Sequence, residues 1–142
     1  LVLMDLPGNE NNIVLNGLFA TENTVVPLKP GEFERNQLQN LERDLDAITE
    51  DTNGDVSPRV SMLIPTMVDL RTNQAEAFVE ELQADYPDRA CESIPVSQNV
   101  SDLQGEGRTL FAAEDDELYS TGMRAREAYR EATETLLEKL RQ

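Results

Sequence analysis

Short apolar runs alternate along this chain with longer segments whose apolar residues recur every three or four positions. The short runs are predicted strands, because several consecutive apolar residues suit a strand that is covered on both faces. They lie at residues 1–4, 24–28, 60–64 and 90–94. The longer segments are predicted helices, at residues 9–20, 32–50, 72–85 and 120–140. Residues 96–119 follow neither pattern, apart from a short helix expected near 101–104.

Alternating strands and helices with short connections are typical of βαβ units, and hence of a parallel sheet with right-handed crossovers. We therefore expect an α/β fold with three layers, α-β-α, around a mainly parallel sheet. Residues 1–142 are expected to form a single domain. The chain opens inside an apolar run with no preceding turn or helix cap. We therefore expect that an N-terminal part is missing.

The charge balance is strongly acidic. The chain has 28 Asp and Glu against 12 Lys and Arg, for a net charge of −16. Ten of the twelve basic residues are arginines, and the acidic residues are spread along the chain. A dispersed acidic surface with little lysine favours a protein adapted to high salt, where screening relieves self-repulsion. The alternative is an ordinary acidic cytosolic protein, which molar KCl would not stabilise.

Residue types that the chain lacks exclude several chemistries. There is no histidine and a single cysteine, Cys91, so Ser-His and Cys-His catalysis, histidine–metal sites and an internal disulfide are excluded. No apolar run approaches the ~20 residues that cross a bilayer, and no basic-then-apolar leader opens the chain. We expect a cytoplasmic protein with no membrane partner.

Candidate ligand-binding residues follow the predicted strands, because open α/β sheets bind ligands at the carboxyl ends of their strands. These positions are Asp5, residues 29–31, residues 66–69 and residues 95–99. Asp5 has the most informative context, since an aspartate that ends an apolar strand can hold a magnesium-bound water. The Pro-Gly pair that follows could sense a terminal phosphate. The structural alternative is that Asp5-Leu6-Pro7-Gly8 is simply a good turn.

Several segments match one known family in the same order and spacing. They are Leu1–Gly8, Asn16–Thr21 with Thr24–Leu28, Ile64–Thr72, Ile94-Pro95 with Asn99-Val100, and Gly107–Phe111. Together they resemble the ParA/MinD (deviant Walker) partition ATPases, whose Walker B strand is followed by Asp, a small residue and Pro. The resemblance covers nearly the whole chain. It implies a P-loop-NTPase-like fold of which this chain is the C-terminal half.

The resemblance also implies a nucleotide site. Asp5 would be the catalytic residue, organising Mg²⁺ through water together with the attacking water. The nucleotide-binding positions would be Pro7, Gly8, Thr66, Ile94 and Pro95, with the first two moving with nucleotide state and the others lining the adenine pocket. For Thr66 and Pro95 the alternatives are structural: a hydroxyl that caps the strand end, and a plain strand terminator.

The chain departs from the family where phosphate would be held. No G-x-x-x-x-G-K-(S/T) motif occurs, and Gly105-Glu106-Gly107 is an acidic loop that repels phosphate. We therefore expect no useful ATP binding or hydrolysis by this chain alone, and no cofactor. Mg-ATP would belong to an intact parent protein. A fragment and a natural stand-alone remnant both account for the missing loop.

Partition-type relatives of this family bind DNA through basic residues. The candidates here are Arg35 and Arg43 on the second helix and Arg124 and Arg126 on the last. The alternative is that these arginines pair with neighbouring glutamates on the same helices.

Three functional hypotheses remain open. In the first, the parent is a ParA-like ATPase in chromosome or plasmid partitioning: ATP closes a homodimer that binds DNA, and a ParB-like partner triggers hydrolysis. In the second, the chain is a non-catalytic, degenerate α/β protein-interaction module. In the third, it is a response-regulator-like α/β domain, for which Asp5 and Lys29 are the available acid and lysine.

Overall fold

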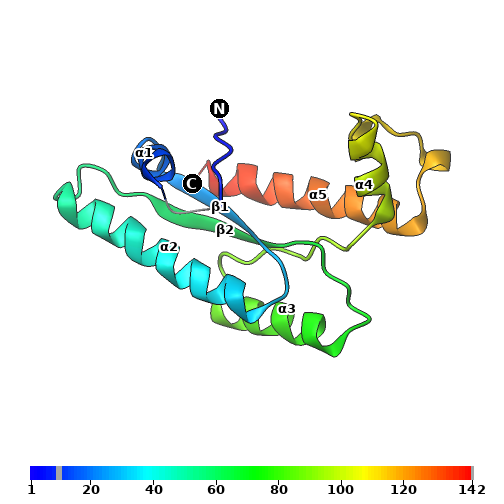
Figure 1. Ribbon diagram of the computed structural model, residues 1–142, viewed down its shortest axis with the longest axis horizontal. Coiled ribbons are helices and arrows are strands. Elements are labelled where there is room, and N and C mark those ends of the chain that lie inside the picture. The colour runs from blue at the N-terminus through cyan, green and yellow to red at the C-terminus, as the bar shows by residue number, and fades with distance from the viewer. Residues whose placement is uncertain (9–10, 142) are drawn as a thin grey trace.

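From α1 onward the fold alternates helices and strands in the predicted order (Figure 1). The structure is a computed structural model that describes residues 1–8 and 11–141, and for residues 32–35 the backbone alone. The elements are α1 (Asn12–Phe19), β1 (Asn23–Leu28), α2 (Glu32–Asp51), β2 (Arg59–Pro65), α3 (Asn73–Asp85), α4 (Gln98–Gly105), the 3-10 turns η1 (Leu110–Ala112) and η2 (Asp115–Glu117), and α5 (Ser120–Lys139). Each predicted helix has an observed counterpart, and α4 is longer than the short helix expected there.

The sheet is parallel, as the alternation predicted. β1 and β2 pair side by side in parallel register. The predicted strand 90–94 runs along the other edge of β2, where it forms two isolated parallel bridges, Leu63 with Ala90 and Val68 with Pro95. The fold class is therefore α/β, with a two-stranded parallel sheet extended by a third, irregular segment.

A bulge in β2 sets which side chains face which helices. Thr24 pairs with Val60 but Val25 pairs with Met62, so that Ser61 has no partner of its own. Val60 and Met62 would share a face in a regular strand, because side chains alternate. The extra residue separates them: Val60 joins the cluster formed with α2 and α3, and Met62 joins the cluster formed with α5. The bulge thus shifts the alternation of side chains in β2, so that Val60 and Leu63 join the α2 and α3 cluster and Met62 joins the α5 cluster.

The main core lies between the sheet and helices α2 and α3. Its apolar positions on the two helices recur at helical spacing, which is why the sequence pattern located both helices. Burying each leucine of this set contributes about 1.5–3 kcal/mol. The buried members are Leu18, Leu28, Leu38, Leu45, Ile48, Val60, Leu63, Val68, Ala75, Phe78, Val79 and Leu82.

A second, smaller cluster joins the irregular part of the chain to α5. Ala125 of α5 packs against four buried residues that precede it in the chain: Leu103 of α4, Leu110 of η1, Ala113 and Leu118. This cluster explains why residues without strand or helix periodicity still have one defined arrangement. Among residues 1–8 and 11–141, no helix combines the length and apolarity needed to cross a membrane.

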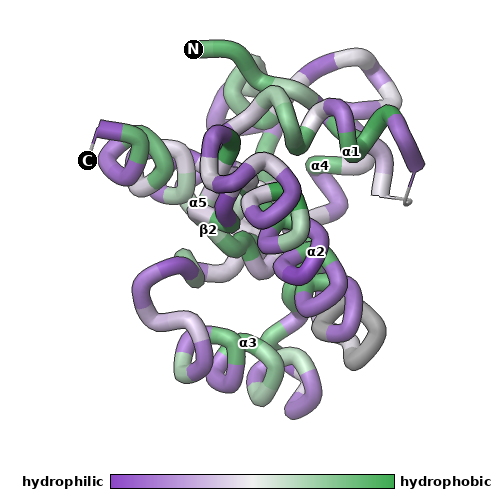
Figure 2. The backbone as a smooth tube through the Cα atoms, turned by 90° about the vertical axis from the view of Figure 1, so that its left-hand side faces the viewer, coloured by the Kyte–Doolittle hydropathy of each residue, from purple (hydrophilic) through white to green (hydrophobic). Residues whose placement is uncertain are grey.

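The first predicted strand is not formed. Residues 1–7 have no regular secondary structure, Leu1 is 90% exposed, and Val2 and Leu3 are each 79% exposed. The hydropathy colouring of Figure 2 shows this N-terminal end as a hydrophobic segment that projects from the molecule. A strand needs a neighbour to pair its backbone groups, and none of the described backbone hydrogen bonds joins residues 1–8 to another segment. An apolar run alone does not supply that partner.

Candidate functional site

The carboxyl ends of β1, β2 and the segment before α4 lie next to one another at one end of the sheet. The N–H of Thr66 donates to the carbonyl oxygen of Leu28 over 2.8 Å. On the other side of β2, the N–H of Ile94 donates to the Pro65 oxygen over 2.7 Å, and the N–H of Val68 donates to the Ile94 oxygen over 3.0 Å. The structure thus brings together three of the residues that the sequence assigned to a nucleotide site, Thr66, Ile94 and Pro95.

Between these contacts, Met67 has a backbone conformation that is rare for a residue with a side chain. Its φ is +55°, in the left-handed region, and its side chain is 53% exposed. The last hydrogen bond to β1 is made by Thr66, whereas the pairing with residues 94–96 continues through Val68. Strained residues of this kind gather at ligand-binding and switch regions. Sequence reasoning missed this feature, because methionine carries no signal for a positive φ.

The loop that follows is fixed by an ion pair between Asp69 and Arg71. The Arg71 Nε and Nη2 donate to the two carboxylate oxygens of Asp69 over 2.8 and 2.7 Å, and the Arg71 backbone N–H donates over 3.2 Å. The side-chain hydrogen bonds from Arg71 lower the pKa of Asp69 to about 2. Thr72 then caps α3, because its Oγ1 accepts from the N–H of Ala75 over 3.3 Å. The ion pair and the helix cap together connect the end of β2 to the start of α3.

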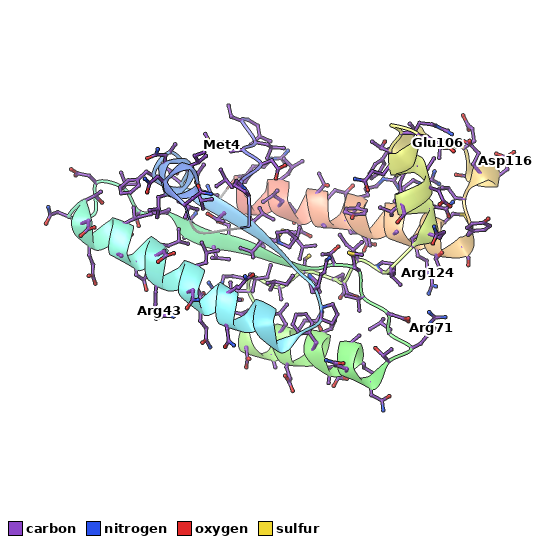
Figure 3. The ribbon with its side chains drawn as sticks, in the orientation of Figure 1. Met4, Arg43, Arg71, Glu106, Asp116 and Arg124 are labelled. Carbon is purple, nitrogen blue, oxygen red and sulfur yellow. The ribbon has the colours of Figure 1, made fainter. Side chains whose placement is uncertain are left out.

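Asp5 does not stand at the end of a strand, because residues 1–4 form none. Its side chain is exposed, as are Pro7 and Gly8. Figure 3 places Met4, the preceding residue, beside α1 and far across the view from Arg71, which follows the carboxyl end of β2. In the described residues, no group of three carboxylate, thiol or imidazole side chains converges where a metal ion could bind. The catalytic and magnesium roles of Asp5 remain predictions.

Two of the four arginines proposed for DNA lie at the start of α5. Arg126 is engaged within the protein: it pairs with Asp115, its Nη1 donates to the Ala113 oxygen over 3.2 Å, and its side chain is only 19% exposed. Arg124 is exposed, and no ion pair or side-chain hydrogen bond joins it to another described residue. Arg124 is therefore the one of these two that is available to an outside phosphate.

The other two candidates lie on α2. Arg43 is exposed, and its side chain contacts the Asn40 side chain and the Gln39 carbonyl oxygen of its own helix. The side chain of Arg35 lies outside the described part of the structure. Arg43 and Arg124 lie at opposite sides of the view in Figure 3, so they do not form one continuous basic surface.

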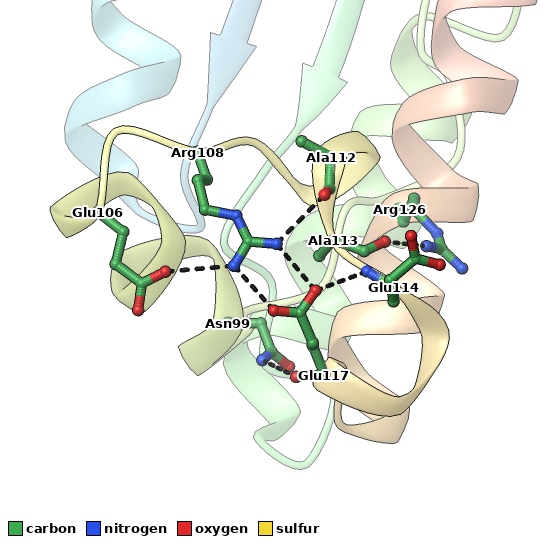
Figure 4. A network of polar contacts seen from close by, with 8 residues as sticks. All are labelled: Asn99, Glu106, Arg108, Ala112, Ala113, Glu114, Glu117 and Arg126. Atoms are coloured by element: carbon green, nitrogen blue, oxygen red, sulfur yellow. Dashed lines mark hydrogen bonds and ion pairs between the residues drawn. The ribbon is translucent and has the colours of Figure 1, made fainter.

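The segment between α4 and α5, which carries the family-like Gly107–Phe111, is held by a polar network centred on Arg108 (Figure 4). The Arg108 guanidinium donates to both carboxylate oxygens of Glu117 over 2.8 Å and to the Ala112 carbonyl oxygen over 3.2 Å. The hydrogen bonds that Glu117 accepts from the Arg108 side chain and from the Glu114 N–H lower the pKa of its carboxyl to about 2. Pairing with Glu117 also raises the pKa of Arg108. Arg108 thus connects Ala112 and Glu117 within this segment.

Asn99 extends this network into α4. It is 5% exposed, its Nδ2 donates to the Glu117 carbonyl oxygen over 3.2 Å, and its Oδ1 accepts from the Tyr119 N–H over 2.9 Å. The sequence marked Asn99 only as part of the family resemblance. Its structural role required contacts with residues 18 and 20 positions away, which no local pattern reveals.

Comparison with known proteins finds distant similarity to chromosome partitioning proteins. The chain is 26% identical over 113 residues to the chromosome partitioning protein ParA of Caulobacter vibrioides (strain NA1000 / CB15N), a match that covers 78% of this chain and 41% of that protein. It is 24% identical over 111 residues to the chromosome partitioning protein ParA of Myxococcus xanthus (strain DK1622), covering 78% of this chain and 38% of that protein. No protein-family profile matches the chain. The chain thus spans about two fifths of the length of the curated relatives that it matches.

Proposed function

We propose that this chain is part of a ParA-like ATPase that acts in chromosome or plasmid partitioning, and that it corresponds to the C-terminal half of a P-loop-NTPase-like, three-layer domain. The observation that carries this proposal is the similarity to two ParA proteins along 78% of the chain. The parallel pairing of β1, β2 and residues 89–96 is consistent with it, because it gathers Thr66, Ile94 and Pro95 at one edge. The proposal includes a cytoplasmic location.

The nucleotide chemistry belongs to the intact protein. We expect no Mg-ATP site from the described residues alone, because no phosphate-binding loop occurs in the sequence. The backbone N–H groups of Thr66 and Ile94 already donate within the sheet, so the proposed contacts with a nucleobase are the Thr66 side chain and the Pro95 carbonyl oxygen. Asp5, Pro7 and Gly8 would contribute only after the N-terminal segment is paired within a larger sheet.

The proposed assembly is a nucleotide-dependent homodimer that binds DNA and responds to a ParB-like partner. DNA affinity comes mainly from neutralising phosphates, and a net charge of −16 opposes it. Of the described candidates, Arg124 is best placed because no other described residue pairs with its charge. Arg126 instead maintains the fold around Ala113 and Asp115.

The test uses the complete coding sequence that contains these residues. We expect that protein to bind Mg-ATP and to hydrolyse it faster with DNA present. Asp5→Ala should lower kcat by at least about tenfold while ATP still binds, as expected for a group that acts on the attacking water. An intact protein that binds no nucleotide would remove the proposal.

The DNA arm of the test compares two arginines. Arg124→Ala should weaken DNA binding, whereas Arg59→Ala, which removes the same charge from an exposed residue at the start of β2, should leave it nearly unchanged. Equal losses from the two variants would mean that net charge, and not a surface at α5, governs binding.

A second candidate is a non-catalytic protein-interaction module. The acidic Gly105-Glu106-Gly107 loop and the lack of a phosphate-binding motif favour it. It predicts that the complete coding sequence adds no phosphate-binding loop and that the purified protein binds no ATP.

A further inference from the structure

The chain contains two Asn-Gly pairs, Asn16-Gly17 and Asn53-Gly54. An asparagine that precedes a glycine is chemically labile, because glycine has no side chain to hinder the attack of its backbone nitrogen on the asparagine amide. The first pair lies inside helix α1, and the second follows the C-terminal end of α2. The fold therefore decides which of the two pairs can react.

The second pair forms the turn that ends α2. Asn53 and Gly54 both have positive φ, +51° and +84°. The Asn53 N–H donates to the Glu50 carbonyl oxygen over 3.0 Å, and the Gly54 N–H donates to the Thr49 oxygen over 2.9 Å. These two bonds are those of a Schellman motif, in which the residue after the helix cap is left-handed. Glycine and asparagine adopt this region most readily, so the turn itself favours a labile pair.

The Schellman motif can open without disturbing the core. Asn53 and Gly54 are both exposed, and a Cβ atom at Gly54 would meet nothing within 4 Å. The Thr52 hydroxyl closes the turn, because it donates to the Ile48 oxygen over 2.8 Å and accepts from the Val56 N–H over 3.2 Å. Opening the motif breaks the hydrogen bond between the Gly54 N–H and α2, which frees the nitrogen to react.

The first pair is packed much more tightly. Gly17 and the residue after it, Leu18, are buried, and Leu18 belongs to the main core. A Cβ atom at Gly17 would stand 2.5 Å from the Leu6 Cδ2, so α1 lies close to the N-terminal segment at this point. Freeing the Gly17 nitrogen requires unwinding α1 and removing Leu18 from the core. We therefore expect the first pair to be protected.

We propose that Asn53 is the main site of spontaneous modification in this protein, by deamidation to aspartate and isoaspartate, and that opening of the Schellman motif sets the rate. The Gly54 backbone nitrogen attacks the Asn53 Cγ: a C–N bond forms, the nitrogen loses its proton, and the side-chain amide nitrogen leaves as ammonia. Water then opens the cyclic imide at either carbonyl carbon, which gives aspartate or isoaspartate. Water is the sole co-reactant. The inference does not rest on the proposed ATPase function.

Isoaspartate at this position should weaken the connection between α2 and β2. It adds a methylene group to the main chain, so the N–H groups of residues 53 and 54 no longer both reach the carbonyl oxygens of α2. Val56, which follows the turn, packs against the main core. The isoaspartate form should therefore unfold at a lower temperature than the unmodified chain.

The test follows both pairs in one sample. The 142-residue chain is incubated at mildly alkaline pH, folded in buffer or unfolded in concentrated urea, and peptide mass spectrometry measures aspartate and isoaspartate at both positions. In urea the two pairs should convert at similar rates, because both precede glycine. In buffer Asn53 should convert about 2- to 12-fold more slowly than in urea, the factor that corresponds to one net hydrogen bond. Asn16 should be slower than Asn53 by at least about tenfold more, because its reaction removes a leucine from the core.

Two threonine variants test the role of the turn. Thr52→Val removes the hydroxyl that closes it, so Asn53 should convert faster in the folded chain while Asn16 is unchanged. Thr49→Val is the matched control, because the Thr49 Oγ1 donates to the Leu45 oxygen within α2 and the substitution keeps the backbone oxygen that accepts from Gly54. Circular dichroism confirms that each variant is folded. If Thr52→Val does not fold, hydrogen exchange in the wild-type chain replaces it, and the Gly54 N–H should exchange faster than the Gly17 N–H.

Any of four results would overturn the proposal. Conversion of Asn16 as fast as Asn53 in the folded chain would mean that α1 gives no added protection. Equal rates for Asn53 in buffer and in urea would mean that the Schellman motif does not set the rate. Equal effects of Thr52→Val and Thr49→Val, or slower exchange at Gly54 than at Gly17, would remove the role of the turn.

Discussion

Gly122 of α5 lies so close to Asn99 of α4 that a side chain at position 122 has no room. A Cβ atom built on Gly122 would stand 2.4 Å from the Asn99 Oδ1 and 2.9 Å from its Cγ. Asn99 cannot simply move aside, because it is buried and both ends of its amide are hydrogen-bonded to the segment that leads into α5. The close approach of the two helices therefore depends on this glycine.

Gly122→Ala should destabilise the protein by about 1–3 kcal/mol, because the added methyl group overpacks a fixed contact. Gly105→Ala is the matched control, since a Cβ there meets nothing within 4 Å. Gly105→Ala should leave stability unchanged or raise it by up to about 1 kcal/mol, because alanine reduces the conformational entropy of the unfolded chain. Urea unfolding at high salt measures both, and equal effects would contradict the packing argument.

Asn99→Ala should cost roughly 1–3 kcal/mol, because it leaves the Tyr119 N–H and the Glu117 carbonyl without their partner. Asn99→Asp keeps the acceptor for Tyr119 but sets a buried carboxylate oxygen against the Glu117 carbonyl oxygen, so a loss at least as large is expected at neutral pH. The penalty of Gly122→Ala should shrink in the Asn99→Ala background, where the clashing amide is absent. Additive effects in that double-mutant cycle would mean that the Asn99 amide does not cause the penalty of Gly122→Ala.

The contribution of Glu117 to stability should depend on pH. Arg108 lowers the pKa of its carboxyl from an ordinary 4.5 to about 2 in the folded protein. A depressed folded-state pKa stabilises the fold above the unfolded-state value, and that stabilisation is lost as pH falls from about 4.5 to about 2. The stability difference between wild type and Glu117→Gln should therefore be largest at pH 7 and shrink towards pH 2.5. Asp116→Asn, which removes the neighbouring charge from a residue outside the network, is the control.

Cys91 should react slowly in the folded protein. It is 9% exposed, and burial raises the pKa of its thiol from 9.0 to about 11. At pH 8 the folded chain then holds about a hundredfold less thiolate than the unfolded chain, and the thiolate is the reactive form. Alkylation by iodoacetamide at pH 8 should be at least that much slower in buffer than in urea. Similar rates in both would mean that the thiol is accessible.

Most helices and two strands could be predicted from the sequence because their signals are local. The spacing of Leu38, Leu45 and Ile48 is the helical period itself, and in the structure these residues are buried on one side of α2. Thr24–Leu28 and Val60–Ile64 were recognised as strands, within one residue of their observed limits. The same rule failed for Leu1–Met4, because pairing partners are not a property of the run itself.

The candidate site was predictable only in part. The rule that ligands bind at the carboxyl ends of strands pointed to Thr66 and Pro95, which the structure brings together. It also pointed to Asp5, whose strand is not formed. The strained Met67 and the engagement of Arg126 with Asp115 gave no sequence signal, since both depend on which residues meet across the fold.

The sequence by itself determined the α/β class, the order of the elements and the acidic surface, because periodicity, turn residues and charge are written in neighbouring positions. Only the tertiary structure decided that Ser61 bulges to redirect β2, that residues 90–95 pair as an irregular third segment, and that Arg126 is turned inward. These features arise from contacts between residues far apart in the chain, and such contacts form only when the helices and strands pack together.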